Sequence, residues 1–253
     1  MPILERQRSG GSLRRPSQRA VFFAAAFLLV AGEALFWLML AAVQTNSGLA
    51  LLDGGVHGAL VEDRSSLATA VLAAVSTVTS PTWLTVIGVL LALGWALRKR
   101  EIWRPALLLG AMVATFGIST LIKHEVARAR PSAADFLMGP DDALSFPSGH
   151  TFGAGVFLLA LVYLLLCSAR PGSAARPVRR ATAVLAFSGA VLGTLLVAFS
   201  RIYLGYHWLT DVVASLGLAV AVVGIVVLVD GLRTARQALE SHPERLGENH
   251  RGG

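Results

Sequence analysis

The sequence predicts an all-α protein, a polytopic membrane helix bundle with six transmembrane helices. Three observations lead to this fold class. The chain has 253 residues, of which 55% are hydrophobic and only 15% are charged. The apolar residues form long runs, most of them close to the ~20 residues that a helix needs to cross a bilayer. The basic residues gather in polar segments between runs, as they do in the cytoplasmic loops of membrane proteins.

The six predicted spans follow from these runs in chain order. They cover residues 20–43, 82–97, 103–122, 149–168, 181–199 and 207–229. The first run has the length of a full span and no clear small-residue cleavage site follows it, so we expect an uncleaved helix rather than a signal peptide. Glu33 lies inside this span. A carboxylate at membrane depth is a functional candidate, although a hydrogen bond to a neighbouring helix is its more ordinary role.

The segment between the first two spans has a different character. Residues 44–66 mix polar residues with short apolar runs, and the apolar run 67–80 is short for a span and ends at Pro81. We therefore expect an extracytoplasmic, interfacial helical segment here. The predicted domain organisation is a disordered, basic cytoplasmic N-terminus (1–19), a six-span membrane domain (20–230) and a charged cytoplasmic tail (231–253).

The basic residues also predict the orientation of the chain in the membrane. With the N-terminus in the cytoplasm and six spans, most of the 22 lysines and arginines face the cytoplasm, and both termini lie there. This bias explains the net charge of +7 without nucleic-acid binding. The alanine- and arginine-rich composition suggests a bacterial plasma membrane. The basic residues expected on the extracytoplasmic side are Arg64, Lys123, Arg128, Arg130 and Arg201; all but Arg64 adjoin one predicted helix start, which suggests a function.

That helix start is the stretch Phe146-Pro147-Ser148-Gly149-His150-Thr151. Ser148 is a favourable N-cap, so Gly149 and His150 fall in the first helical turn. Free backbone N–H groups and the positive end of the helix dipole favour an anion there, and a glycine lets the backbone approach it closely. A histidine beside the anion can give or take a proton near neutral pH. The stretch therefore predicts half of a phosphate site.

Two further clusters lie at the extracytoplasmic ends of predicted spans. One is Lys123, six residues, then Arg130-Pro131; the other is Ser200-Arg201, five residues, His207, three residues and Asp211. His207 and Asp211 are four residues apart at a helix start and so share one face. A carboxylate bonded to one ring nitrogen fixes the tautomer and leaves the other nitrogen as a nucleophile.

The remaining groups complete a two-step phosphoryl transfer. Arg201 can bind phosphate oxygens bidentately, while Lys123 and Arg130 supply charge to the transition state. In the route that these groups allow, His207 would attack phosphorus and His150 would protonate the alcohol that leaves. Water then releases phosphate from the phosphohistidine.

Together these clusters resemble the motifs of the type 2 phosphatidic acid phosphatase family, in a superfamily that also contains vanadium haloperoxidases. The family pattern is Lys-x6-Arg-Pro, Pro-Ser-Gly-His and Ser-Arg-x5-His-x3-Asp, and the chain matches every specified position. The resemblance extends from about Ala20 to Leu228. It implies a metal-independent enzyme without a cofactor, in which Lys123, Arg130, Ser148, Gly149 and Arg201 bind phosphate, His150 is the general acid, His207 is the nucleophile and Asp211 orients His207.

The loop that joins the first two clusters, residues 124–148, holds other polar residues. Its carboxylates are Glu125, Asp135, Asp141 and Asp142, for which a metal-binding role is the less favoured hypothesis. His124 and Arg128 are close enough in sequence to touch a lipid head group, but we expect them on a solvated face. The single Cys167 forms no internal disulfide.

The leading expectation is a lipid phosphatase whose site faces the extracytoplasmic leaflet. Its substrate is a lipid phosphomonoester or pyrophosphate, with phosphatidic acid, phosphatidylglycerophosphate and polyprenyl pyrophosphates as candidates. Haloperoxidase chemistry on bound vanadate is disfavoured by the six spans, because the haloperoxidases of the superfamily are soluble. A lipid phosphotransferase and a non-enzymatic lipid carrier remain alternatives, and the oligomeric state is left open.

Overall fold

The computed structural model of the chain describes residues 17–166 and 179–240. Within these residues every regular element is helical, so the all-α prediction is confirmed. The elements are α1 (Gln18–Thr45), η1 (Gly48–Leu52), α2 (Asp53–Glu62), α3 (Ser66–Val78), α4 (Pro81–Lys99), α5 (Trp103–Val126), η2 (Ala133–Asp135), α6 (Gly149–Leu166), α7 (Arg180–Tyr203) and α8 (Leu209–Glu240), where η marks a short 3₁₀ helix.

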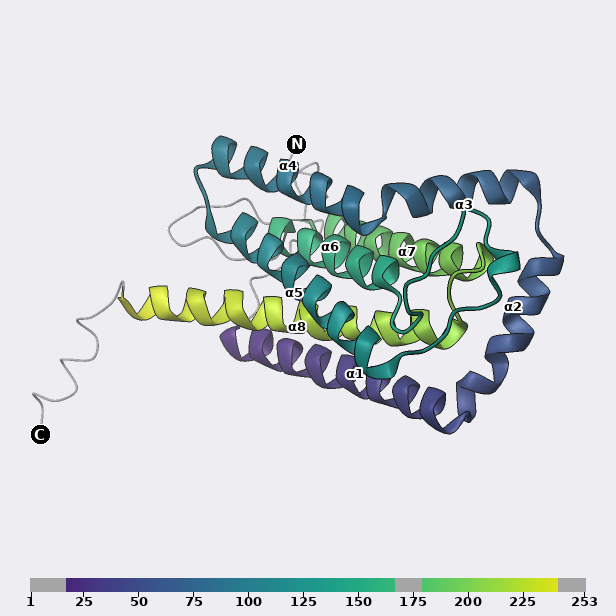
Figure 1. Cartoon of the computed structure of the whole chain (residues 1–253). Coiled ribbons are helices and arrows are strands. Elements are labelled where there is room, and N and C mark those ends of the chain that lie inside the picture. The colour runs from purple at the N-terminus through teal and green to yellow at the C-terminus, as the bar shows by residue number, and fades with distance from the viewer. Residues whose placement is uncertain (1–16, 167–178, 241–253) are drawn as a thin grey trace, which may run out of the picture.

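Six helices in the described part of the chain are long and apolar enough to cross a membrane. They are α1, α4, α5, α6, α7 and α8, each at one of the predicted spans. Figure 1 shows these helices running side by side along one direction, with α2 and the irregular loops gathered at one end of the bundle. The protein is therefore a multi-pass membrane protein with the six-span architecture that the sequence predicts.

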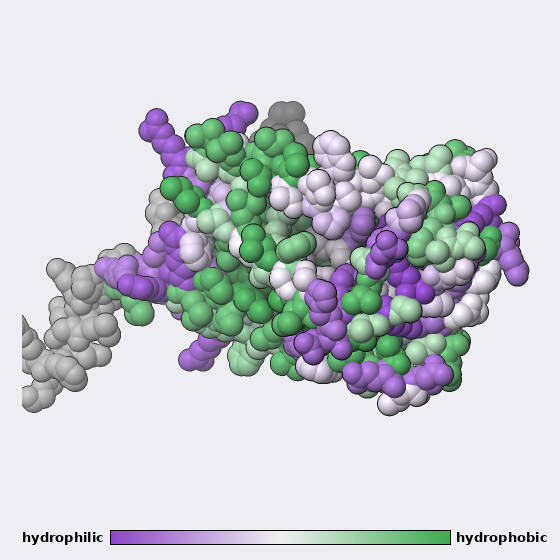
Figure 2. Space-filling view, viewed as in Figure 1, coloured by the Kyte–Doolittle hydropathy of each residue, from purple (hydrophilic) through white to green (hydrophobic). Residues whose placement is uncertain are grey.

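The surface of the bundle fits a lipid environment. Large apolar side chains stay exposed on the long helices, including Phe23, Phe27, Leu90, Phe116 and Leu192. Figure 2 shows apolar residues covering much of the bundle, while hydrophilic residues gather toward its two ends. In water such a surface would favour aggregation, whereas in a bilayer it faces acyl chains.

Close backbone contact joins the first helix to the last. A Cβ atom added at Gly32 would lie 2.5 Å from the backbone of Gly217 and Ala221, and one added at Gly224 would lie 2.8 Å from Leu29 N. Small residues allow membrane helices to approach in this way, which replaces the hydrophobic driving force that lipid cannot supply. Helix α1 consequently packs chiefly along α8, as Figure 1 shows.

The segment between α1 and α4 is helical but too short to span. Helix α3 has 13 residues, a length of about 20 Å at ~1.5 Å per residue, against a hydrocarbon core of about 30 Å. Ser65 caps its start by accepting a hydrogen bond from Ala68 N, and Ser80 caps α4, which has Pro81 in its first turn. The predicted interfacial segment 44–80 is thus three short helical pieces, η1, α2 and α3.

The C-terminal helix is longer than predicted. The sequence placed the end of the last span at 229 and a charged tail from 231, whereas α8 continues to Glu240. Residues after Asp230 include Leu, Ala, Arg and Gln, which favour helix even though they are less apolar. The predicted disorder of the N-terminus is wrong for its last three residues, because Ser17 caps α1 and Gln18 and Arg19 form its first turn. The rest of that segment, the rest of the tail and most of the loop 169–180 fall outside the described residues.

Candidate active site

The three predicted clusters meet at the loop-rich end of the bundle. Helix α5 ends three residues after Lys123, α6 begins at Gly149, and His207 lies in the short connection between α7 and α8. Charges at Arg201, Arg130 and Lys123, together with the His207 ring, all lie within electrostatic range of His150. The structure therefore brings together the side chains that the sequence assigned to catalysis and phosphate binding.

His207 and Asp211 form a buried pair on one face at the start of α8. The His207 Nδ1 atom lies 3.3 Å from Asp211 Oδ2, and the two side chains are 2% and 0% exposed. The same Oδ2 atom accepts a hydrogen bond from Trp208 N at 3.0 Å and another from the Ser145 hydroxyl. Asp211 is thus held by two donors, with the oxygen that they bind also in contact with the His207 ring.

Electrostatics keep the His207 ring neutral. Burial lowers the pKa of His207 well below its ordinary value, and the positive charges of Arg201, Arg130 and Lys123 lower it further. The Nε2 atom lies 3.3 Å from Arg130 Nη1. A neutral ring that donates from Nδ1 to Asp211 has its lone pair on Nε2, directed toward the cationic cluster. That is the tautomer which a nucleophile needs.

Arg130 is held by its own loop and by the α7–α8 connection. Its Nε donates to Ala143 O at 2.5 Å, its Nη1 donates to Tyr206 O at 2.7 Å, and its Nη2 pairs with Asp141 Oδ2 at 2.9 Å. Lys123 Nζ donates to Leu144 O in the same loop. Both cations therefore have fixed positions beside His207.

Arg201 has a donor that is still free. Its Nη1 donates to Ser76 Oγ of α3 at 2.6 Å, and its guanidinium lies 4.4 Å from the centroid of the Tyr206 ring. Its Nε is buried and has no hydrogen-bond partner among the described residues. A buried N–H without a partner costs about 1–3 kcal/mol, a cost that an oxygen acceptor bound at this position would remove.

The start of α6 has the predicted geometry. The helix begins at Gly149, and Ser148 Oγ accepts hydrogen bonds from Thr151 N at 3.5 Å and Thr151 Oγ1 at 3.1 Å. A Cβ atom added at Gly149 would meet only Ser119 Oγ, at 3.7 Å. Packing therefore does not require a glycine here, and the space beside the first turn is compatible with the predicted approach of an anion.

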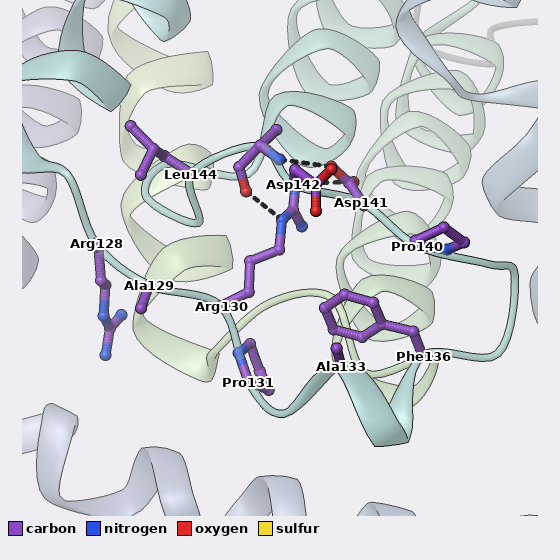
Figure 3. Close-up of a pocket in the computed structure, with 11 residues that line it drawn as sticks. Arg128, Ala129, Arg130, Pro131, Ala133, Phe136, Pro140, Asp141, Asp142 and Leu144 are labelled. Atoms are coloured by element: carbon purple, nitrogen blue, oxygen red, sulfur yellow. Dashed lines mark hydrogen bonds and ion pairs between the residues drawn. The ribbon is translucent and has the colours of Figure 1, made fainter.

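A pocket of about 230 Å³ opens beside this cluster. It is lined by residues of the loop from Arg128 to Leu144. The charged groups of this lining are Arg128, Arg130, Asp141 and Asp142. Figure 3 shows Arg130 extended from the loop toward Asp141, and Arg128 pointing away from them. The pocket thus leads to one of the cations that lie next to His207.

Sequence reasoning missed one part of the site. Arg128 was expected on a solvated face, and this is wrong: its guanidinium bonds to Asp211 Oδ1 at 2.5 Å, to Thr210 Oγ1 at 2.7 Å and to Asp53 Oδ2 at 2.7 Å. Its place among the extracytoplasmic cations was a signal in the sequence. Asp53, in the interfacial segment, had no comparable signal.

The other polar residues that the sequence singled out are either exposed or bonded to a nearby side chain. Glu33 accepts a hydrogen bond from Trp37 Nε1 in its own helix, not from a neighbouring one. Of the four carboxylates considered for a metal, Asp141 pairs with Arg130 and Asp135 pairs with His57, while Glu125 and Asp142 are exposed, as is His124. Those carboxylates do not converge on one point.

Comparisons with known proteins agree with the motifs and the fold. A sequence profile described as the PAP2 superfamily matches residues 104–234. Phosphatidylglycerophosphatase B of Bacillus subtilis (strain 168) is 27% identical over 186 residues, which cover 73% of this chain and 87% of that protein. A crystal structure described as the first transmembrane PAP2 type phosphatidylglycerolphosphate phosphatase, also from Bacillus subtilis, has a similar fold, with a TM-score of 0.69 and 22% identity over 79% of this chain and 94% of that one.

Proposed function

The chain belongs to the PAP2 superfamily, and from this premise we propose that it is a membrane phosphatase that hydrolyses a lipid phosphomonoester through a phosphohistidine. The observation that carries the proposal is the state of His207. Its ring is neutral and fully buried, and its Nε2 lies 3.3 Å from the guanidinium of Arg130. A nucleophile aimed into a group of cations suits attack on an anionic phosphate.

The reaction proceeds in two displacements. Nε2 of His207 bonds to phosphorus while the ester P–O bond breaks, and His150 gives a proton to the departing alcohol oxygen. Asp211 stabilises the positive charge that develops on the imidazole. Water then loses a proton to His150 and attacks phosphorus, the P–N bond breaks, and phosphate leaves with the enzyme restored. Lys123, Arg130 and the free Nε of Arg201 hold the phosphate oxygens throughout.

The favoured substrate is phosphatidylglycerophosphate. The name of Bacillus subtilis phosphatidylglycerophosphatase B and the description of the similar crystal structure refer to this lipid. The protein is embedded in a membrane, and the cations lie at the end of a bundle whose sides are apolar, where a lipid head group meets its acyl chains. Phosphatidic acid and polyprenyl pyrophosphate offer the same terminal phosphate and are the alternatives that the assay below separates.

We place the site on the extracytoplasmic side. The five basic residues that depart from the cytoplasmic bias all have partners near the site: Arg64, for example, donates to Tyr203 O at 3.1 Å and to Asp135 O at 2.8 Å. Their position is explained by these contacts and by phosphate binding. The other lysines and arginines are then left to determine orientation, and they favour cytoplasmic termini.

The test is phosphate release by the purified protein in detergent with EDTA present. Phosphatidylglycerophosphate, phosphatidic acid and undecaprenyl pyrophosphate are compared, with His207→Ala as the control. We expect release that survives EDTA, is fastest with phosphatidylglycerophosphate and is lost in the control. Substrate labelled with ³²P should leave an acid-labile, alkali-stable label on the wild type but not on His207→Ala.

Other outcomes separate the alternatives. A trapped label that yields no free phosphate, but passes to an added alcohol as a new phosphate ester, would identify a phosphotransferase. Binding of the lipids without label or release, by protein that remains folded, would identify a carrier. Loss of release in EDTA would return the loop carboxylates to consideration as metal ligands.

A further inference from the structure

A second buried carboxylate, Asp53, is linked through Arg128 to the pair of His207 and Asp211. We propose that Asp53 of the interfacial segment is a positioning residue, which acts through Arg128 to set the orientation and charge of Asp211. The inference rests on the proposed function, because its consequence is expressed through His207. Asp53 lies outside the three motif clusters and 158 positions before Asp211 in the chain.

The two oxygens of Asp211 have different partners. Oδ2 serves the active-site side: it lies 3.3 Å from His207 Nδ1 and accepts from Trp208 N and from Ser145. Oδ1 accepts from Arg128 Nη1 at 2.5 Å. A rotation of the carboxylate would break contacts on both sides, so Arg128 helps to fix the oxygen that faces His207.

Arg128 is itself held in place by several contacts. Its Nη1 also donates to Thr210 Oγ1 at 2.7 Å, and its Nη2 donates to Asp53 Oδ2 at 2.7 Å. Its guanidinium lies 5.6 Å from the Trp208 ring centroid. The guanidinium is a planar fork, so two carboxylates on separate nitrogens determine its plane.

Asp53 bonds to the start of α8. It is 4% exposed; its Oδ1 accepts from Thr210 N at 2.9 Å and its Oδ2 accepts from Thr210 Oγ1 at 2.6 Å. A carboxylate that binds free N–H groups at a helix N-terminus is the arrangement of a cap, here supplied by a distant segment. Asp53 therefore holds both Arg128 and the turn of α8 that carries Asp211.

The charges give this arrangement a role in the reaction. Arg128 is shared between two buried carboxylates, so Asp53 offsets part of its charge. As Nε2 bonds to phosphorus, the imidazole becomes positive, and Asp211 must stabilise that charge. Without the Asp53 charge, Arg128 would act on Asp211 alone and oppose the positive imidazole more strongly. Removal of the Asp53 charge should therefore lower kcat and leave phosphate binding unchanged.

The experiment uses the full-length protein in detergent with the preferred lipid substrate. Asp53→Asn, which is nearly isosteric, should lower kcat by about tenfold to a hundredfold, by analogy with residues that orient the ligands of a metal site. KM and the inhibition constant of inorganic phosphate should stay within about twofold, because Lys123, Arg130 and Arg201 are unchanged. Asp63→Asn is the matched control: it makes the same change at an exposed residue at the C-terminal end of α2, and it should keep wild-type kcat.

Non-additivity distinguishes positioning from general support of the fold. In an Asp211→Asn background, Asp53→Asn should cause no further loss of kcat, because its effect passes through Asp211. If Asp53→Asn does not fold, Arg128→Lys, which keeps the charge but loses the fork, should show the same loss with KM unchanged.

Two results would overturn the inference: wild-type kcat in Asp53→Asn, or a full additional loss in the Asp211→Asn background. Either result counts only if the wild-type protein has lipid phosphatase activity and His207→Ala does not. If the wild type lacks this activity, or His207→Ala keeps it, the proposed function is overturned instead.

Discussion

His207 determines how the stability of the protein should depend on pH. Its pKa is well below the ordinary value in the folded state because the ring is buried beside three cations. Below about pH 6.5 the unfolded chain binds a proton at this residue and the folded protein does not. The free energy of unfolding therefore falls as pH decreases, by up to about 1.4 kcal/mol per pH unit, until the folded pKa is reached.

This predicts a difference between the wild type and His207→Gln. The two thermal midpoints in detergent should change in parallel from pH 8.5 to 7.5, because His207 is neutral in both states of the wild type. Between pH 6.5 and 5 the wild type should lose more stability than the variant, since glutamine does not titrate. Parallel curves across the whole range would mean that His207 titrates normally in the folded protein.

Gly149 can be tested against a glycine one turn further along α6. Gly149→Ala and Gly153→Ala each place a Cβ 3.7 Å from the nearest side-chain atom, so neither should lower the thermal midpoint. Gly149→Ala should nevertheless reduce kcat/KM about tenfold or more, because the methyl group occupies the anion side of the first turn. Gly153→Ala should retain wild-type kcat/KM. Equal activity in both variants would remove Gly149 from the phosphate site.

Individual residues differ in how far the sequence revealed them. His207, Asp211 and Arg130 were predictable because their chemistry recurs at fixed spacing next to helix ends. Asp53 was not, because its role depends on a fold contact with Thr210, 157 positions away. Arg128 belongs to the loop 124–148, which the sequence marked as part of the site. Only the structure shows that its guanidinium joins two carboxylates rather than facing solvent.

At the scale of single elements, the contact between α1 and α8 requires glycine at position 217. A Cβ at Gly217 would lie 2.7 Å from Gly32 O, whereas one at Gly189 of α7 would meet nothing within 4 Å. Gly217→Ala should therefore destabilise the protein, by about 1–3 kcal/mol as overpacking does. Gly189→Ala should leave it unchanged or stabilise it by up to about 1 kcal/mol through helix propensity.

The measurement is the thermal midpoint of each variant in the same detergent, with phosphate release as a check of folding. Opposite signs for the two substitutions are the expected result. If Gly217→Ala is as stable as Gly189→Ala, the two helices are not in backbone contact, and the packing described for α1 and α8 is wrong.

Elements were predicted well where hydropathy alone decides them. The six spans appear at their expected places, because an apolar run of sufficient length has few alternatives to a membrane helix. The end of α8 was missed because the prediction followed hydropathy, which falls after Asp230, whereas helix propensity continues to Glu240. The fold of residues 44–66 into η1 and α2 depends on contacts that no local pattern contains.

The whole molecule has an orientation that labelling can test. In a Cys167→Ser background, Ser132→Cys lies in the exposed loop beside the site and Lys99→Cys at the far end of α4. A maleimide that does not cross membranes should label Ser132→Cys in intact cells and Lys99→Cys only after permeabilisation. The reverse pattern would place the active site in the cytoplasm.

The pairing of α1 with α8 also has a consequence for the order of assembly. About 160 residues separate the end of α1 from the start of α8, so at ~5–20 residues per second the ribosome makes α8 on the order of ten to thirty seconds after α1. During that interval α1 resides in the bilayer without its main partner, and its glycine face contacts lipid. Helix α8, the last of the described helices to be made, also carries Asp211 and the Thr210 that bonds to Asp53. Completion of the active site and burial of the first helix are therefore the same late event in biogenesis.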